Sequence, residues 1–185
     1  SIDTKRFSRK KTENNKKIVL GWTGTFSSIP YLDLLKDVLM DLNKSEQFKV
    51  LLITNFDYSL SGIDLDIVKW NKDTEIEDLH KIDVGLYPLS IDKWSLGKGG
   101  LKVLQYMSIG IPSVATNYGT ACDIITHGET GFLVSEKAQW ISVLKNLINN
   151  PELRDTIGKN ARERTVKKYS LEQIQSKYLK VLNSL

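Results

Sequence analysis

The feature of this sequence that most constrains its fold is a regular alternation of short apolar runs with longer amphipathic stretches. Residues 18–22 form an apolar run typical of a buried parallel strand, and residues 31–43 carry apolar side chains at helical spacing. The same patterns predict further strands at 50–54, 65–70, 83–87, 113–116 and 131–134, and helices at 74–81, 100–109, 135–149, and from 151 and 170 onward. Strands that alternate with helices predict a doubly wound α/β fold of the Rossmann type, with a parallel sheet covered on both faces.

Polar residues that accept hydrogen bonds from free backbone amides are expected where three of these helices begin. Thr74 with Glu77 and Ser170 with Gln173 have the spacing of a capping box, and Ser135 has the character of a simple N-cap.

The positive charge of the chain is concentrated at its N-terminal end. The whole chain has a net charge of +4, but residues 1–17 hold seven basic and two acidic residues, so the remainder is close to −1. We therefore expect residues 1–17 to be a basic linker and residues 18–185 to be the folded domain, which should bind its ligand equally well when the chain begins near Lys16. The alternative is an arm that binds nucleic acid or an anionic surface, although nucleic-acid binding usually needs a basic face on the folded domain.

Several functions are excluded by composition. No window approaches 18 unbroken apolar residues, so no membrane-spanning helix is predicted. One cysteine cannot form an intramolecular disulfide, and two histidines do not make a zinc-ligand cluster. A cytoplasmic setting is the expectation, and because the sequence starts without Met we expect a piece of a longer chain.

In a doubly wound fold, ligands bind beyond the C-terminal ends of the strands, so the loops after residues 22, 54, 70, 88 and 116 are the candidate binding loops. The first loop contains Gly24 and Thr25, but its spacing matches neither the dinucleotide fingerprint nor a P-loop. Asn55 directly follows the second strand. Trp70 ends the third strand, where it either stacks near a nucleotide base or belongs to the core.

Residues 97–107, with the sequence GKGGLKVLQYM, have the strongest binding pattern in the chain. Lys98, Gly99, Gly100 and Leu101 lie where a helix starts, so an ammonium group and free amides are directed to one place. This combination predicts a site for an anion such as phosphate.

Two more polar residues share that helix face. Lys102 follows Lys98 by four positions and Gln105 follows Lys102 by three. The alternative interpretation is that both lysines are solvated and Gln105 is an ordinary surface residue.

Several separate stretches resemble one family in the right order. They are SIDTKRF at 1–7, GWTGTFSSIPYL at 21–32, a W-x(4)-E-x-x-D-L pattern at 70–79, LQYMSIGIPSVAT at 104–116 and HGETGFLV at 127–134. Together they resemble the C-terminal, donor-binding half of a retaining GT-B glycosyltransferase of the "glycosyl transferases group 1" family.

The resemblance implies a function and a set of roles. The parent protein would move a sugar from a nucleotide diphosphate sugar to a glycan or lipid-linked acceptor, without a metal or other cofactor and at most peripherally associated with the inner face of the membrane. Lys98 and Lys102 would be the catalytic residues that stabilise the departing diphosphate. Gly24, Thr25, Asn55, Trp70, Gly99, Gly100, Leu101 and Gln105 would contact the donor. The acceptor would be bound by an N-terminal domain, so this chain alone would bind without turnover.

The sequence departs from the family pattern at two positions. The family usually places two glutamates eight residues apart, the first near the donor sugar and the second on the ribose hydroxyls. Here these positions are Gly97 and Gln105, which is a feature of the branch with G-K-x-G-x-K-x-L-Q-Y-M. Gln105 can still hydrogen-bond a ribose diol, but without the charge of a carboxylate.

Two rivals to a transferase remain at this level: the nucleic-acid or anionic-surface binder described above, and a protein that shares the fold but transfers no sugar. A nucleotide-sugar epimerase or a non-catalytic nucleotide-sugar-binding module could share the fold, because fold alone does not fix function.

The acidic pair Asp64 and Asp66 has the D-x-D spacing of a metal site, but at a strand start alternate acidic residues are expected to face solvent.

Overall fold

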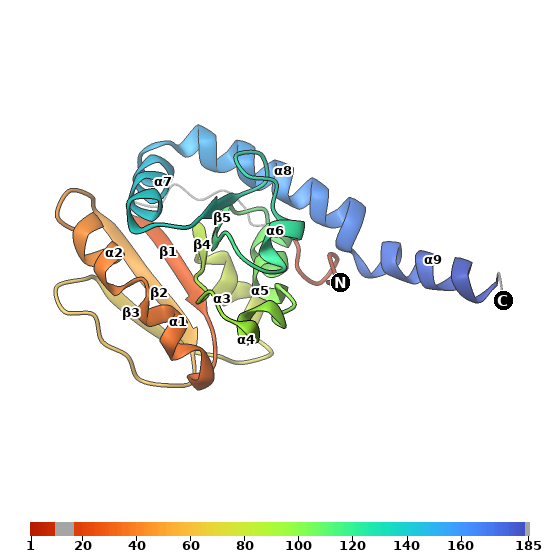
Figure 1. Cartoon of the computed structure of the whole chain (residues 1–185), viewed down its shortest axis with the longest axis horizontal. Helices are drawn as coiled ribbons and strands as arrows, with labels where there is room; N and C mark the ends of the chain where they lie inside the picture. Colours follow the sequence, from red (N-terminus) through yellow and green to blue (C-terminus); the bar gives the residue numbers. More distant parts are fainter. Residues whose placement is uncertain (10–16, 184–185) are drawn as a thin grey trace.

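The computed structural model describes residues 1–9 and 17–183, and in this part of the chain one sheet forms the centre of the molecule (Figure 1). The strands are β1 (Ile18–Thr23), β2 (Phe48–Thr54), β3 (Leu65–Lys69), β4 (Val84–Tyr87), β5 (Ser113–Thr116) and β6 (Phe132–Val134). They are all parallel and their order is β3-β2-β1-β4-β5-β6. The predicted doubly wound fold is confirmed, with β1 and β4 as its central pair.

Helices cover both faces of the sheet (Figure 1). The helical segments are η1 (Phe26–Ser28), α1 (Ile29–Asp33), α2 (Lys36–Leu42), α3 (Glu75–His80), α4 (Lys93–Leu96), α5 (Leu101–Ser108), α6 (Ala121–Ile124), α7 (Lys137–Asn149), α8 (Pro151–Tyr169) and α9 (Leu171–Leu182). Side chains of α2 and α7 pack into the apolar cluster on one face and those of α3, α5 and α6 into the cluster on the other, while α1 and α8 contribute to both. Helix α9 continues outward from α8, away from the sheet (Figure 1).

The apolar runs form strands because both faces of the sheet are buried. Along β2, Leu52 belongs to one apolar cluster, whereas its neighbours Leu51 and Ile53 belong to the other. Successive side chains of a strand point to opposite faces, so a continuous apolar run serves two cores at once. Each fully buried side chain of this size contributes about 1.5–3 kcal/mol relative to an exposed one.

Two expectations about the elements are wrong in detail. The helix predicted at 31–43 is two short helices, because the amides of Leu34 and Leu35 bond to carbonyls three residues back and tighten the turn between α1 and α2. The strand predicted as buried at 65–70 is the edge strand β3, and Asp66 on it is exposed and paired with Lys49.

The predicted helix caps are confirmed at one of three positions. Ser170 accepts a hydrogen bond from the amide of Gln173 at the start of α9, which is one of the two bonds of the expected capping box. Thr74 does not cap α3; its hydroxyl donates to Asp78 instead. The N-cap of α7 is Glu136, one residue later than expected.

Residues 1–9 are packed against the domain, which differs from the solvated linker expected from their charge. Ile2 and Phe7 are buried in the apolar cluster that includes α5. The Ile2 amide donates to the Tyr169 carbonyl at 2.9 Å, and the guanidinium of Arg162 donates to the Phe7 carbonyl at 2.6 Å. Burial of two apolar side chains outweighs the preference of the neighbouring charges for water, which stay at the surface. Residues 10–16 of the expected linker lie outside the described residues.

The described basic residues of this segment are paired within the chain. Lys5 pairs with Glu172, Arg6 with Glu75, Arg9 with Asp155 and Lys17 with Asp64, at distances of 2.9 to 3.1 Å. Their charges are therefore compensated locally and do not form a free basic face.

Candidate functional site

A pocket of about 340 Å³ opens at the C-terminal ends of the two central strands, β1 and β4. The chain leaves β1 toward α1 on one face of the sheet and leaves β4 toward α5 on the other, so the loops diverge and leave a crevice. Seven of the ten predicted site residues line this pocket: Thr25, Lys98, Gly99, Gly100, Leu101, Lys102 and Gln105.

The start of α5 is shaped by a glycine in a conformation that other residues rarely adopt. Gly100 has a φ of +64°, and a Cβ atom there would lie 2.5 Å from Cδ1 of Ile124. The turn lets α5 begin at Leu101 with its first amides free of partners inside the helix, as in every α-helix. A Cβ at Gly99 would meet nothing within 4 Å, so the space beside these amides is open.

Two lysine side chains lie against aromatic rings at the wall of the pocket. The Lys98 ammonium lies 4.7 Å from the centre of the Tyr31 ring, and the Lys102 ammonium lies 4.8 Å from the Trp22 ring. Such contacts are worth about 0.5–2 kcal/mol, which is less than a buried cation loses on leaving water. Among the described residues, neither ammonium has a carboxylate within ion-pair distance.

The environment of Lys102 is unfavourable for its charge. Burial, together with the nearby charge of Lys98, lowers the pKa of Lys102 to about 8. Two neighbouring cations beside free helix amides form a positive site that a phosphate group would neutralise.

The glycine loop after β1 contributes to the pocket mainly through Thr25. The backbone of Gly24 bonds to strand β2 instead: its amide donates to the Ile53 carbonyl, and its own carbonyl accepts a hydrogen bond from the Thr54 hydroxyl. A Cβ on Gly24 would lie 2.0 Å from the Trp22 ring, so a glycine is needed for that ring to hold its place beside Lys102. Gly24 therefore shapes the wall and does not line the pocket.

Asn55 and Trp70 also lie outside the pocket lining. Asn55 is an exposed residue in the bend after β2. Trp70 is 42% exposed, so it is not a core residue, and its ring N–H points toward Glu75 at 3.4 Å.

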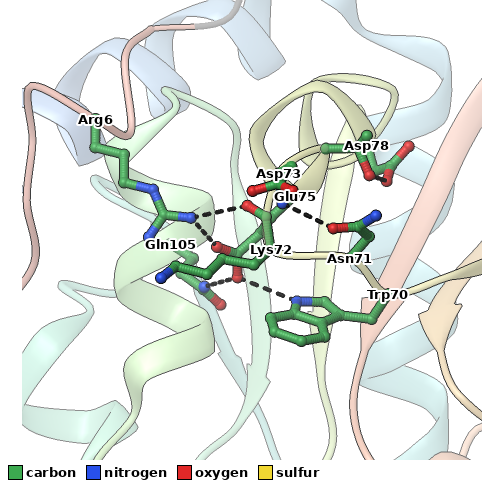
Figure 2. Close-up of polar contacts among 9 residues, drawn as sticks. Arg6, Trp70, Asn71, Lys72, Asp73, Glu75, Asp78 and Gln105 are labelled. Carbon is green, nitrogen blue, oxygen red and sulfur yellow. Dashed lines mark hydrogen bonds and ion pairs between the residues drawn. The ribbon is translucent and has the colours of Figure 1, made fainter.

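The carboxylate of Glu75, which was not expected at the site, is hydrogen-bonded to the side chain of Gln105 (Figure 2). The amide nitrogen of Gln105 donates to Oε1 of Glu75 at 3.0 Å, and Arg6 donates to the other oxygen, Oε2, at 2.9 Å. The Glu75 side chain is only 13% exposed. In the sequence, Glu75 stands out only as part of the family-like stretch after Trp70; its signal is an acidic residue soon after the C-terminal end of a strand.

The acidic pair Asp64 and Asp66 is engaged with lysines. Asp64 pairs with Lys17, and Asp66 pairs with Lys49. Within residues 1–9 and 17–183, no group of three or more histidine, cysteine, aspartate or glutamate side chains could hold a metal ion. In the same ranges, no helix combines the length and the apolar character that crossing a bilayer requires.

The fold and the pocket define a class: a Rossmann-like domain with a crevice at its switch point that is lined by two lysines. The model of the family described as "Glycosyl transferases group 1" matches residues 3–164. The chain belongs to this family, and its fold is that of the C-terminal domain of GT-B glycosyltransferases, as the sequence resemblance implied.

Individual relatives support the same assignment. The chain is 35% identical over 82 residues to the capsular polysaccharide biosynthesis glycosyltransferase CapM of Staphylococcus aureus, a match that covers 40% of this chain and 21% of CapM. The four curated relatives it matches are each covered over 14% to 28% of their length. The chain therefore corresponds to one part of these proteins.

Solved structures share the fold at low sequence identity. The structure of Anabaena Alr3699/HepE in complex with UDP is similar with a TM-score of 0.78 and 18% identity, covering all of this chain and 56% of that one. The C-terminal domain of LpcC, a glycosyl transferase group 1 family protein of Francisella tularensis, has a TM-score of 0.70 and 17% identity, covering 92% of this chain and 100% of that one.

Proposed function

We propose that this chain is the donor-binding part of a glycosyltransferase, and that its pocket binds a nucleotide diphosphate sugar. The observation that carries the proposal is the convergence of Lys98, Lys102 and the free amides of α5 on one crevice, with no carboxylate among the described residues to neutralise the lysines. A diphosphate supplies the missing negative charge. The HepE structure, which holds UDP in a protein of the same fold, supports this choice of ligand.

The roles of the lysines follow from the chemistry of sugar transfer. When the bond between the sugar and the diphosphate breaks, negative charge develops on the departing diphosphate. Fixed cations and amides that are already directed to that charge stabilise the transition state more than the ground state. Lys98 and Lys102 are the catalytic residues in this proposal, and no metal ion is required.

The substrate details are also part of the proposal. Gln105 at the pocket wall hydrogen-bonds the ribose diol, and Trp70, outside the pocket lining, stacks near the base. The acceptor, a glycan or a lipid-linked sugar, is bound by a part of the whole protein beyond this chain, and transfer proceeds with retention of anomeric configuration. The protein acts in the cytoplasm or at the inner membrane face.

A panel of thermal unfolding measurements tests the proposal. The chain is heated with UDP, GDP, ADP or CMP, and in parallel with the matching nucleosides. A ligand at 100 times its dissociation constant adds about 2.7 kcal/mol to the free energy of unfolding, which shifts the melting temperature by several degrees. Stabilisation by at least one diphosphate but not by its nucleoside is expected. No shift with any nucleotide would contradict a donor site.

Binding alone does not separate a transferase from an epimerase or a silent nucleotide-sugar-binding module. Assaying the full-length parent for sugar transfer from the preferred donor separates them, since an epimerase changes the sugar but releases no diphosphate. The other alternative, an anionic-surface or nucleic-acid binder acting through residues 1–17, is less favoured because Lys5, Arg6, Arg9 and Lys17 are paired within the chain.

A further inference from the structure

Gln105 has a specific hydrogen-bond partner on the side away from its own helix. A glutamine amide has one end that only donates and one end that only accepts. Glu75 presents a carboxylate, which only accepts, at 3.0 Å from the Gln105 amide. The carboxylate therefore determines that the NH₂ end of Gln105 faces Glu75, and the carbonyl oxygen Oε1 is the end that remains for another partner.

Glu75 is itself held from two further directions (Figure 2). Its Oε2 accepts a hydrogen bond from Arg6, whose guanidinium also donates to the Lys72 carbonyl at 3.2 Å. Its Oε1 is approached by the Trp70 ring nitrogen at 3.4 Å. A side chain that is 13% exposed and has donors on both oxygens has little freedom to rotate.

We infer that Glu75 is a positioning residue that makes Gln105 a hydrogen-bond acceptor toward the ribose hydroxyls of the donor. Gln105 lines the pocket, and among the described residues no donor is recorded for its side-chain oxygen. An acceptor at this wall selects a ligand that offers a hydroxyl hydrogen, as a ribose diol does, whereas an NH₂ group there would bond the hydroxyl oxygen instead. The Gln105 side chain lies between the Glu75 carboxylate and the ligand, and Arg6 forms an ion pair with that carboxylate. The inference rests on the proposed nucleotide site.

The test measures discrimination between sugars, which a purely structural role would not change. Dissociation constants are measured for UDP and GDP and for their 2′,3′-dideoxy-2′,3′-difluoro forms, in which fluorine replaces each hydroxyl and has no hydrogen to donate. A neutral hydrogen bond is worth about 0.5–1.5 kcal/mol, so the unaltered chain should prefer a ribonucleotide by about 2- to 13-fold. The preference should fall toward unity in Glu75→Gln, because Gln105 can then turn its NH₂ end to the ligand, and an NH₂ group can bond a hydroxyl oxygen or approach a fluorine. Glu77→Gln is the matched control on the exposed side of α3 and should keep the preference.

Double substitutions show whether Glu75 acts through Gln105. In a Gln105→Leu background, Glu75→Gln should cause no further change in the ratio of the two constants. The exchanged pair Glu75→Gln with Gln105→Glu should restore the preference, because an amide and a carboxylate again face each other. If Glu75→Gln unfolds the chain, Glu75→Asp gives the same test, since the shorter side chain cannot reach both Arg6 and Gln105.

The possible failures are distinguishable. Retention of the full preference in Glu75→Gln, or an added effect of Glu75→Gln in the Gln105→Leu background, would overturn the positioning role while the nucleotide site stands. Equal binding of the ribo and difluoro forms by the unaltered chain would overturn it together with the contact from the ribose hydroxyls to Gln105. Absence of binding by UDP, GDP, ADP and CMP alike would reject this inference together with the proposed function.

Discussion

The ammonium of Lys102 lies 4.8 Å from the centre of the Trp22 ring, and the pKa of this lysine is lowered to about 8. The two residues come from elements on different sides of the switch point, β1 and α5. The ring holds the side chain in place but replaces only part of the hydration that the charge loses. The Lys102 ammonium is therefore charged at neutral pH but loses its proton near pH 8.

Diphosphate affinity should fall as the pH rises above about 8. A bound diphosphate favours the charged form of Lys102, so binding above its pKa requires uptake of a proton. The expected loss is up to about tenfold in affinity per pH unit, because one pKa unit corresponds to about 1.36 kcal/mol. Titration calorimetry from pH 7 to 9.5 measures the slope. Lys102→Arg, which stays charged, should bind with little slope; an equal slope in that variant would assign the titration to another group.

The same shift predicts how stability depends on pH without ligand. The unfolded chain holds the Lys102 proton up to its ordinary pKa of 10.5, whereas the folded chain releases it near pH 8. Between these values the unfolded state binds more protons, so the contribution of Lys102 to stability rises with pH. Denaturant unfolding of the unaltered chain and of Lys102→Met at pH 7.5 and 9.5 isolates this contribution. A gain with pH that is the same in both proteins would contradict it.

Lys98→Ala should weaken diphosphate binding and leave nucleoside binding nearly unchanged. A hydrogen bond from a charged donor is worth about 1.5–3 kcal/mol, which is roughly one to two orders of magnitude in the dissociation constant. Lys102→Ala is the comparison, and Lys159→Ala on the exposed side of α8 is the control. A Lys98→Ala variant that binds the diphosphate normally, or that loses nucleoside and diphosphate affinity equally, would rule out the assigned phosphate contact.

Gly100→Ala should destabilise the fold, whereas Gly99→Ala should be nearly neutral for stability. Alanine at position 100 would adopt a φ of +64° and press its Cβ against Ile124 at 2.5 Å, while the space at position 99 is open. The conformational cost alone is about 1–2 kcal/mol, and the contact adds to it. The midpoint of urea unfolding measures both variants. Similar midpoints for the two would show that the turn can relax.

Phe7→Ala should destabilise the domain by about 3–5 kcal/mol, the usual cost of removing a buried phenylalanine. Lys5→Ala is the control, since the Lys5 side chain is 84% exposed and its ion pair is worth at most about 1 kcal/mol. Thermal unfolding measures both. If the two variants unfold alike, residues 1–9 do not contribute to the domain's stability, as the linker interpretation held.

The order of elements could be predicted because strands and helices differ in the period of their apolar residues. The run at 18–22 and the helical pattern at 135–149 each keep one type of apolar pattern, and the structure has β1 at Ile18–Thr23 and α7 at Lys137–Asn149. The edge position of β3 could not be predicted, because an apolar run does not show whether its strand pairs with one neighbouring strand or with two. The buried state of Ile2 and Phe7 was missed because the charges around them dominate the composition of the segment.

The candidate site was predictable in its charged part and not in its supporting contacts. Lys98, Lys102 and Gln105 fall within ten residues, so local geometry brings them to one wall, although Lys98 lies before α5 and does not share its helix face as expected. Glu75 and Arg6 are 30 and 99 positions away from Gln105, and only the parallel pairing of the strands and the packing of the N-terminal residues bring them together. Contacts of this kind leave no periodic signal in a single sequence.

The central pairing of the sheet has a consequence for how the domain folds. Leu20 of β1 pairs with Val84 of β4, across 64 positions, whereas β1 and β2 pair across 30. Closing the longer loop costs more chain entropy, and non-local strand pairing is slow. The half that contains β1 to β3 can therefore form first and present the glycine loop, but the lysines arrive only when β4 and α5 dock beside it. A nucleotide whose site includes residues of both halves can bind only after both halves have folded, so it would not accelerate either folding step. Once bound, it would slow the separation of β4 from β1 and lengthen the lifetime of the folded state.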